Sequence, residues 1–367
     1  MNVFLDLSAP FALVVVVTGA LFYWMPRLTR PDLYFAVTLP ADFRDSAAGR
    51  AQLSRYRLKV VLASLSALVI LVFGAIRNSP ALLLAALVVQ QAGTLLAYFA
   101  ARSQVKPYAT EPTPMREAAL SPRDAHIPGG WLAQAGPFAM LAVTGLYLQL
   151  HWSAIPERFP IHWGIDGQPN GWATRTGPGV YGPLLIAAAT CLLLGAIAYG
   201  VLHASRPIRL SGAAGQSESG FRFTVAAIFV GAEYLMAIVF SWTSLLPLLH
   251  SGSGAPAIWG VLVASLLFAV VAVVLLVRLG QGGTRAAQTA PRGPFEREAP
   301  PVGDRIQDRY WKGGLLYVNS EDPALFVEKR FGMGYTLNFG RPASWVMLTA
   351  LLLVPVVVAL AVKWGGK

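Results

Sequence analysis

Residues 151–178 read HWSAIPERFPIHWGIDGQPNGWATRTGP, a polar segment rich in Gly and Pro that lies between two long apolar runs. Proline favours extended backbone at the residue before it, so Pro156 and Pro160 favour an extended start to this segment. The run Ile161–Trp163 then predicts a short strand.

Turn signals follow the predicted strand. Gly and Asn tolerate the positive φ angles that tight turns need. Such residues stand at Gly164, Asp166-Gly167 and Asn170-Gly171. The segment therefore predicts a compact folded loop, not a flexible tether. Its tryptophans Trp152, Trp163 and Trp172 are suited to the membrane–water boundary.

The loop also carries a specific pattern, Ile-Pro-x-x-x-Pro-x-His-Trp followed by Asp-Gly-Gln-Pro-Asn-Gly-Trp and a basic residue. This pattern, with its flanking helices over about residues 140–190, resembles the bacterial domain of unknown function 1648. That domain is best known from SdpI-type immunity proteins, which protect cells against a toxic peptide. The residues that carry the resemblance are Pro156, Pro160, His162, Gly167, Pro169, Gly171, Trp172 and Arg175.

The resemblance implies that the loop recognises an extracellular peptide or another envelope molecule. The candidate ligand-binding residues are His162, Trp163, Asp166, Asn170, Trp172 and Arg175. A metal site formed by His162 and Asp166, with His151 nearby, is the alternative, but this spacing matches no zinc motif. We expect a histidine held by hydrogen bonds, and neither a metal nor a cofactor.

The composition is that of an integral membrane protein. Of the 367 residues, 55% are hydrophobic and 13% are charged, against roughly 25% charged in soluble domains. The mean hydropathy is +0.54. The single Cys191 excludes an intramolecular disulfide and a cysteine metal cluster. The net charge of +11 is explained by the positive-inside rule, so we expect the lipid bilayer as a partner and no nucleic acid.

Eight apolar runs are long enough to span a bilayer, which needs about 20 residues. They are 9–25, 60–76, 81–101, 132–150, 180–202, 223–249, 258–277 and 345–362. The segments between them place 24 of the 29 Lys and Arg on one side, which predicts that this side is cytoplasmic. Both termini and the 151–178 loop are then outside, in the inner membrane of a bacterium as the resemblance implies.

The predicted fold is an all-α membrane protein of about eight helices, with a compact outer loop between the fourth and fifth. We divide the chain at 1–131, 132–202, 203–278, 279–308, 309–341 and 342–367. Residues 45–58 predict a basic amphipathic helix that leads into the second span. Residues 279–308 are rich in Gly, Pro and charge, which predicts a disordered linker.

Residues 309–341 predict a small cytoplasmic β-rich module before the last helix. Short β-prone runs at Leu315–Val318, Phe326–Glu328 and Tyr335–Phe339 are separated by turns. The segment resembles the domain of unknown function 5808 through Trp311, Gly314, Tyr317, Asn319, Asp322-Pro323, Val327, Lys329-Arg330, Gly332, Gly334 and Thr336-Leu337-Asn338-Phe339. A further β-prone run, Tyr34–Leu39, lies on the same predicted side, and we expect it to pair with these strands.

Glu233 is an acidic residue well inside an apolar run. It lies 11 residues past Arg222, or about 16 Å at about 1.5 Å per residue, near the middle of the bilayer. Such residues often mark proton or substrate pathways. The structural alternative is a neutral Glu233 hydrogen-bonded to Gln90 or Gln91, which lie at a similar depth. The sequence leaves these two interpretations nearly balanced.

Three classes of function follow. The first is a binding or immunity-type membrane protein that acts through the 151–178 loop. The second is a proton-coupled transporter or channel that uses Glu233. An enzyme is third, because the sequence contains no HExxH, phosphate-binding GxxxxGK[ST] or GxSxG motif.

Overall fold

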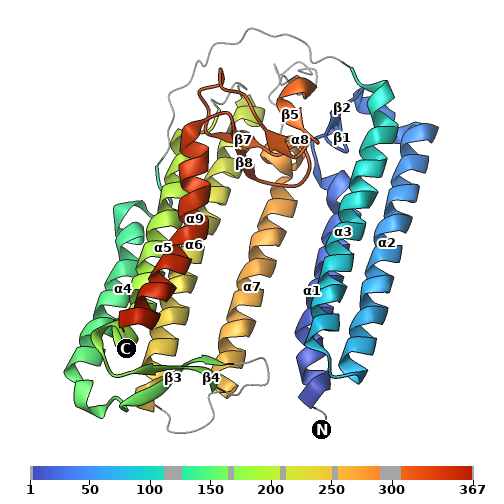
Figure 1. Ribbon diagram of the computed structural model, residues 1–367. Coiled ribbons are helices and arrows are strands. Elements are labelled where there is room, and N and C mark those ends of the chain that lie inside the picture. The colour runs from blue at the N-terminus through green and yellow to red at the C-terminus, as the bar shows by residue number, and fades with distance from the viewer. Residues whose placement is uncertain are drawn as a thin grey trace.

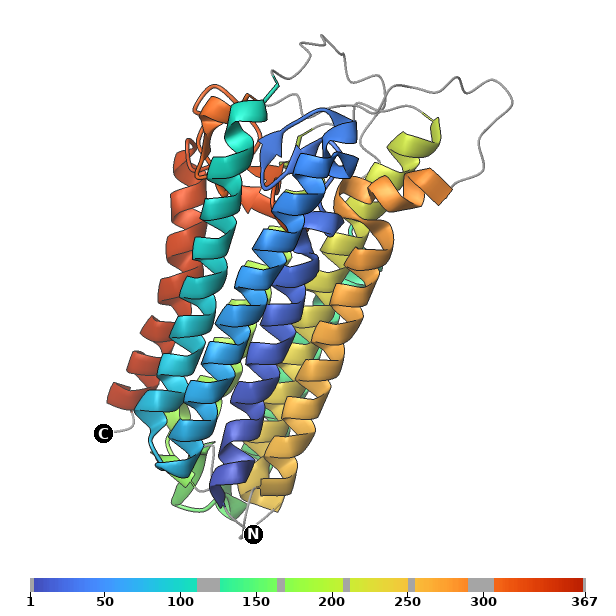
Figure 2. The ribbon, with the colours of Figure 1, turned by 90° about the vertical axis from the view of Figure 1, so that its right-hand side faces the viewer.

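The computed structural model describes residues 3–110, 126–163, 169–206, 212–249, 255–289 and 307–365. Within these ranges the chain forms a bundle of long helices that run alongside one another (Figure 1), and Figure 2 shows the same arrangement from the side. The long helices are α1 (Val3–Leu28), α2 (Ala47–Ile76), α3 (Pro80–Val105), α4 (Gly130–Leu150), α5 (Gly177–His203), α6 (Gly212–Leu249), α7 (Ala255–Leu279) and α9 (Pro342–Gly365).

Each predicted apolar run lies inside one of these helices. The helices α1 to α7 are each long and apolar enough to cross a membrane. Helix α9, which contains the predicted run 345–362, packs along α5. The chain is therefore a multi-pass α-helical membrane protein. The amphipathic helix predicted over 45–58 is not a separate element but the first part of α2. The Ser46 hydroxyl caps this helix by accepting from the Gly49 amide at 3.0 Å.

The helices pack in two groups. In the first group, α1, α2 and α3 share an apolar core around Val15, Leu71 and Leu83. In the second, α4, α5 and α6 share a core that includes Leu141 and Leu184, and α7 and α9 pack beside them. Figure 1 shows the first group on one side of the molecule and the second group on the other.

Both chain termini lie at the same end of the bundle as strands β3 (Arg158–Trp163) and β4 (Pro169–Thr174), and we call this the hairpin end (Figure 1). At the opposite end lies the cap, which comprises residues 29–46 and 307–341. Its strands are β1 (Leu33–Tyr34), β2 (Val37–Thr38), β5 (Trp311–Lys312), β6 (Leu316–Tyr317), β7 (Phe326–Glu328) and β8 (Tyr335–Leu337).

The prediction that Tyr34–Leu39 pairs with the strands of the C-terminal module is wrong. Strand β1 pairs with β2 in a hairpin of its own, with Leu33 opposite Thr38. The turn residues Phe35 and Ala36 have φ of 48° and 60°, a conformation that side chains other than glycine rarely adopt. This reversal of the chain prevents the run from forming one extended strand.

The β1–β2 hairpin nevertheless contacts the C-terminal module through side chains. Arg102 of α3 donates to the carbonyl oxygens of Phe35 at 3.1 Å and Ala36 at 2.6 Å. The Tyr98 hydroxyl donates to the Gly313 carbonyl at 3.0 Å. Phe35 stacks on Phe331 with ring centroids 6.4 Å apart. The cap therefore joins the first helix group to a module near the other end of the chain.

In the C-terminal module β5 pairs with β6 and β7 with β8. The predicted β-prone runs contain β6, β7 and β8, whereas β5 was not predicted. Buried Asn338 connects these hairpins. Its amide nitrogen donates to the carbonyl oxygens of Asn319 at 2.8 Å and Ala324 at 3.1 Å, and its side-chain oxygen accepts from the Asn319 amide at 3.0 Å. Since nearly all of its hydrogen-bonding capacity is used, Asn338 fixes the path of the turns.

The first part of the predicted linker at 279–308 is ordered, which corrects the expectation of disorder there. A 3-10 turn over Gln281–Gly283 leads into the short helix α8 (Thr284–Thr289). Buried Gln281 exchanges two hydrogen bonds with the backbone of Gly334, of 2.9 and 2.8 Å. This reciprocal pair of hydrogen bonds resembles the pair that two opposite residues exchange in an antiparallel sheet. Residues 290–306 lie outside the described part of the chain.

Candidate functional site

Within the 151–178 segment, β3 and β4 pair as an antiparallel hairpin that contacts α5 and α6. Arg158 lies opposite Thr174, Phe159 opposite Ala173, and Pro160 opposite Trp172. Irregular register follows Pro160, as expected where a proline removes an amide donor from the ladder. The predicted strand Ile161–Trp163 is thus the second half of β3.

The base of this hairpin is tightly anchored. Ile155 and Phe159 are buried in the apolar core formed by α4, α5 and α6. The Arg175 guanidinium donates to the carbonyl oxygens of Ser153 at 3.1 Å and Ile155 at 2.9 Å, and the Arg175 amide donates to the Glu157 carbonyl at 2.9 Å. Arg175 therefore joins the end of β4 to the residues that precede β3.

The outer face of the hairpin presents apolar and cationic groups together. The Trp172 side chain is 47% exposed and that of Ile161 is 38% exposed. The Arg158 guanidinium lies over the Trp172 ring, 5.0 Å from its centroid, an attractive cation–π contact. Arg158 lies two positions before Pro160, which pairs with Trp172, so side-chain alternation places Arg158 and Trp172 on one face of the hairpin and buried Phe159 on the other.

The other predicted loop residues have the following positions. His162 and Trp163 belong to β3, where they pair with Gly171 and Pro169, and Asn170 lies in β4 between these two partners. Asp166 lies outside the described residues. The prediction of a turn at Asn170-Gly171 is wrong, because Gly171 pairs with His162 inside the ladder. His151 stacks on Tyr147 one helical turn earlier, with centroids 4.2 Å apart. Among the described residues, no three His, Cys, Asp or Glu side chains gather as metal ligands would.

Glu233 is fully buried within the second helix group. A Cβ placed on Gly195 of α5 would lie 2.9 Å from Gln134 Oε1 and 3.4 Å from Glu233 Oε1, so the two polar side chains converge beside this glycine. The Gln134 side chain is the hydrogen-bonding neighbour of the Glu233 carboxyl group. Ionisable groups inside a membrane-spanning helix bundle are costly and often functional, so this pair is a candidate site.

The prediction that Glu233 bonds to Gln90 or Gln91 is wrong. Both glutamines belong to α3 in the first helix group. Gln90 is buried and donates to the Ser64 hydroxyl at 3.1 Å, and Gln91 faces outward. Depth alone did not identify the partner, because residues at one depth can belong to separate groups of helices.

Two members of these sites were missed from the sequence. Alternation along β3 could have identified Arg158, which lies on the face of the strand opposite to apolar Phe159. Gln134 lies only two residues inside the predicted run 132–150. This position predicts that Gln134 lies at the membrane boundary and not at the depth of Glu233. In the structure α4 begins below the cap-end limits of α5 and α6 (Figure 1), and Gln134 therefore reaches the depth of Glu233.

Comparison with known families matches two segments. A family described as a domain of unknown function, DUF1648, matches residues 139–188, and one described as a family of unknown function, DUF5808, matches residues 320–345. The two resemblances to these domains are thus confirmed, over the hairpin with its flanking helices and over β7 and β8. No curated protein and no solved structure matches the chain. The matches name no ligand and no reaction.

Proposed function

We propose that the chain is a bacterial inner-membrane protein whose β3–β4 hairpin recognises an extracellular peptide or another envelope molecule, in the manner of immunity-type proteins. One observation carries this proposal. The hairpin is fixed at its base by Arg175 and buried Phe159, yet it exposes the Arg158–Trp172 pair. An exposed residue pair on a rigid base is pre-organised for binding.

The proposed orientation rests on charge. The sequence segments that the apolar runs assign to one side, which include the two parts of the cap, carry 24 of the 29 Lys and Arg, and this favours a cytoplasmic cap. Both termini lie at the hairpin end (Figure 1), so on this proposal both are outside together with the hairpin. The cap then has access to cytoplasmic molecules.

The hairpin supports a specific mode of peptide binding. Within the described residues, β3 and β4 form a two-stranded sheet with no further strand on either outer edge. An extended peptide can add to such an edge through backbone hydrogen bonds. Trp and Arg are enriched at the centres of binding interfaces, so Trp172 and Arg158 are the proposed specificity contacts.

The test is a deletion strain challenged with a panel of membrane-active peptides and scored for sensitivity. The wild-type gene should restore resistance, and Trp172→Ala should not. Trp131→Ala is the matched control, because Trp131 is an exposed tryptophan at the start of α4, away from the hairpin. If Trp172→Ala protects as well as wild type while deletion sensitises the strain, the hairpin is not the recognition site. If deletion changes no sensitivity, an immunity role is wrong.

A second candidate function is favoured by the Glu233–Gln134 pair. A buried carboxyl group beside an amide is the kind of group that transporters use to bind a proton or substrate. On this proposal Glu233→Gln folds normally but loses a pH-dependent activity. Proton uptake into vesicles that contain the purified chain would measure this. Equal uptake by wild type and Glu233→Gln would exclude the coupling role.

A further inference from the structure

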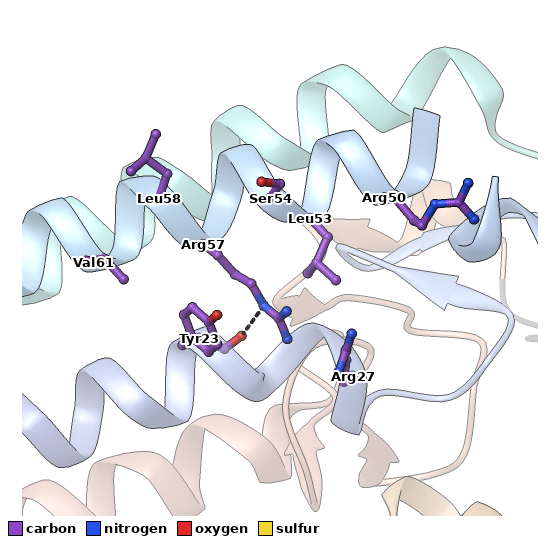
Figure 3. A pocket seen from close by; sticks show the side chains of 8 residues that line it. All are labelled: Tyr23, Arg27, Arg50, Leu53, Ser54, Arg57, Leu58 and Val61. Carbon is purple, nitrogen blue, oxygen red and sulfur yellow. Dashed lines mark hydrogen bonds between the residues drawn. The ribbon is translucent and has the colours of Figure 1, made fainter. Parts of the chain in front are cut away.

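A pocket of about 470 Å³ opens between the last turns of α1 and the first turns of α2, on the cap side of the bundle. Its lining residues are Tyr23, Arg27, Arg50, Leu53, Ser54, Arg57, Leu58 and Val61. Figure 3 shows the arginines grouped toward one end of the pocket, with Leu58 and Val61 at the other. The pocket is therefore polarised, cationic at one end and apolar at the other.

The cationic end lacks carboxylate partners. In the part of the chain that the structure describes, no ion pair joins Arg27, Arg50 or Arg57 to an acidic side chain. Arg50 donates instead to the backbone oxygen of Asp45. Three guanidinium groups near one pocket repel each other, so an anion that bound among them would be stabilised.

Arg57 is held in place for such an anion. Its Nε donates to the Tyr23 carbonyl at 3.4 Å (Figure 3). Its guanidinium lies over the rings of Tyr23 at 4.3 Å and Trp24 at 5.2 Å. Its Nη2 is buried and has no hydrogen-bond partner among the described residues. Because a buried donor without a partner is costly, this atom indicates a missing acceptor. A phosphate matches the planar fork of donors that arginine presents.

The apolar end distinguishes a lipid from a soluble phosphate. Leu58 and Val61 are exposed, and the same face of α2 continues toward the hairpin end with exposed Leu62, Leu65 and Val69. Such a face suits acyl chains. Exposed Trp24 flanks the cationic end, as tryptophan does at the level of lipid headgroups. A free inorganic phosphate would contact only the arginines and would make no contact with this apolar face.

We propose that this pocket binds the phosphate headgroup of an anionic phospholipid, with Arg57 and Arg27 contacting the phosphate and the apolar face of α2 contacting the acyl chains. This site is separate from the hairpin and from Glu233, so it stands whether or not the proposed function is correct. The lipid would fix α1 against α2 at the cap side of the membrane.

The test is native mass spectrometry of the full chain in detergent, titrated with phosphatidylglycerol, phosphatidylcholine or inorganic phosphate. Wild type should bind phosphatidylglycerol more tightly than the other two. Arg57→Gln and Arg27→Gln should each weaken this binding about fivefold, the change expected for one basic residue near an anionic headgroup. Arg27 is exposed, so its variant keeps the test valid if Arg57→Gln fails to fold.

Arg55→Gln is the matched control, because Arg55 is an exposed residue of α2 two positions from Arg57 and does not line the pocket. It should bind phosphatidylglycerol as wild type does. Equal weakening by Arg55→Gln and Arg57→Gln would mean a diffuse basic surface and overturn the proposal. Equal affinity for the two lipids would also overturn it. Inorganic phosphate binding as tightly as phosphatidylglycerol would reassign the pocket to a soluble anion.

Discussion

The Arg330 guanidinium donates to the backbone oxygen of Ala36 at 3.4 Å, although 294 positions separate the two residues. Arg330 is only 1% exposed. It also donates to the Asp308 carboxylate, and its guanidinium lies 5.3 Å from the centroid of the Trp311 ring. One buried side chain thus contacts both halves of the cap.

Replacing this side chain should loosen the cap. Arg330→Gln removes the donor to Asp308 and should lower the free energy of unfolding by about 2 kcal/mol, the scale of a hydrogen bond to a charged group. Thermal unfolding in detergent measures this. Exposed Arg309 provides the control, and Arg309→Gln should leave the melting temperature within about 1 °C of wild type. Equal melting temperatures for all three proteins would show that Arg330 contributes nothing.

Gly314 should tolerate no side chain. Its φ is +77°, and an added Cβ would lie 2.6 Å from Tyr98 Oη, 2.6 Å from Arg102 Nη1 and 2.7 Å from Ala36 Cβ. Gly334 is the matched control, since its φ is +89° but a Cβ added there would meet nothing within 4 Å. Gly334→Ala should cost about 1–2 kcal/mol for the left-handed backbone alone, and Gly314→Ala clearly more. If thermal unfolding shows that Gly314→Ala and Gly334→Ala lower the free energy of unfolding equally, the cap accommodates the Cβ at position 314 without a steric cost.

Two buried tyrosines of the cap should ionise only at a pH above the usual pKa of tyrosine. Burial raises the pKa of Tyr34 to about 12, against the opposing effect of Arg44, and burial likewise raises the pKa of Tyr317 to about 12, against the opposing effect of Arg206. Since the folded-state values exceed the usual value of 10.0, the stability they contribute is complete below about pH 10. It is lost as the pH rises from about 10 to 12.

Phenolate absorbance during a base titration measures this effect. Tyr34→Phe and Tyr317→Phe should each remove one hydroxyl group that ionises near pH 12. If ionisation of the folded protein is complete by about pH 10.5 with no loss of structure, the burial of these hydroxyls is wrong.

Glu233 should couple to Gln134 and not to Gln90. Glu233→Gln should preserve folding, and Glu233→Ala should cost on the order of 1 kcal/mol, the scale of interhelical polar contacts in membranes. In double-mutant cycles the effects of Glu233→Ala and Gln134→Ala should be non-additive, because the two side chains converge beside Gly195. The cycle with Gln90→Ala is the control and should be additive. Coupling to Gln90 alone would restore the partner expected from the sequence.

Much of the fold follows from local sequence. Long apolar runs must form helices in a bilayer because the backbone has no other partner there, and each predicted run lies within one observed helix. The strand Phe326–Glu328 was also placed correctly, since β-branched and aromatic residues between turn signals favour extended backbone.

The predictions that were wrong concern residues whose conformation depends on contacts with distant parts of the chain. Nothing in Phe35-Ala36 predicts a left-handed turn, which usually takes Asn and Gly. The carbonyl oxygens there are satisfied by Arg102 and Arg330, from two distant parts of the chain. Gln134 was missed for a similar reason, since the depth at which α4 begins depends on its packing against α5 and α6.

The cap also determines when some contacts of the first three helices can form during synthesis of the chain. Ribosomes add about 5–20 residues per second, so the 294 positions between Ala36 and Arg330 correspond to about 15–60 s of translation. During that interval Tyr98 lacks Gly313 as a hydrogen-bond acceptor and Phe35 lacks the cover of Phe331. The first three helices therefore enter the membrane as an incomplete unit. The aromatic residues Phe35 and Tyr98 stay uncovered until the last part of the chain has been made.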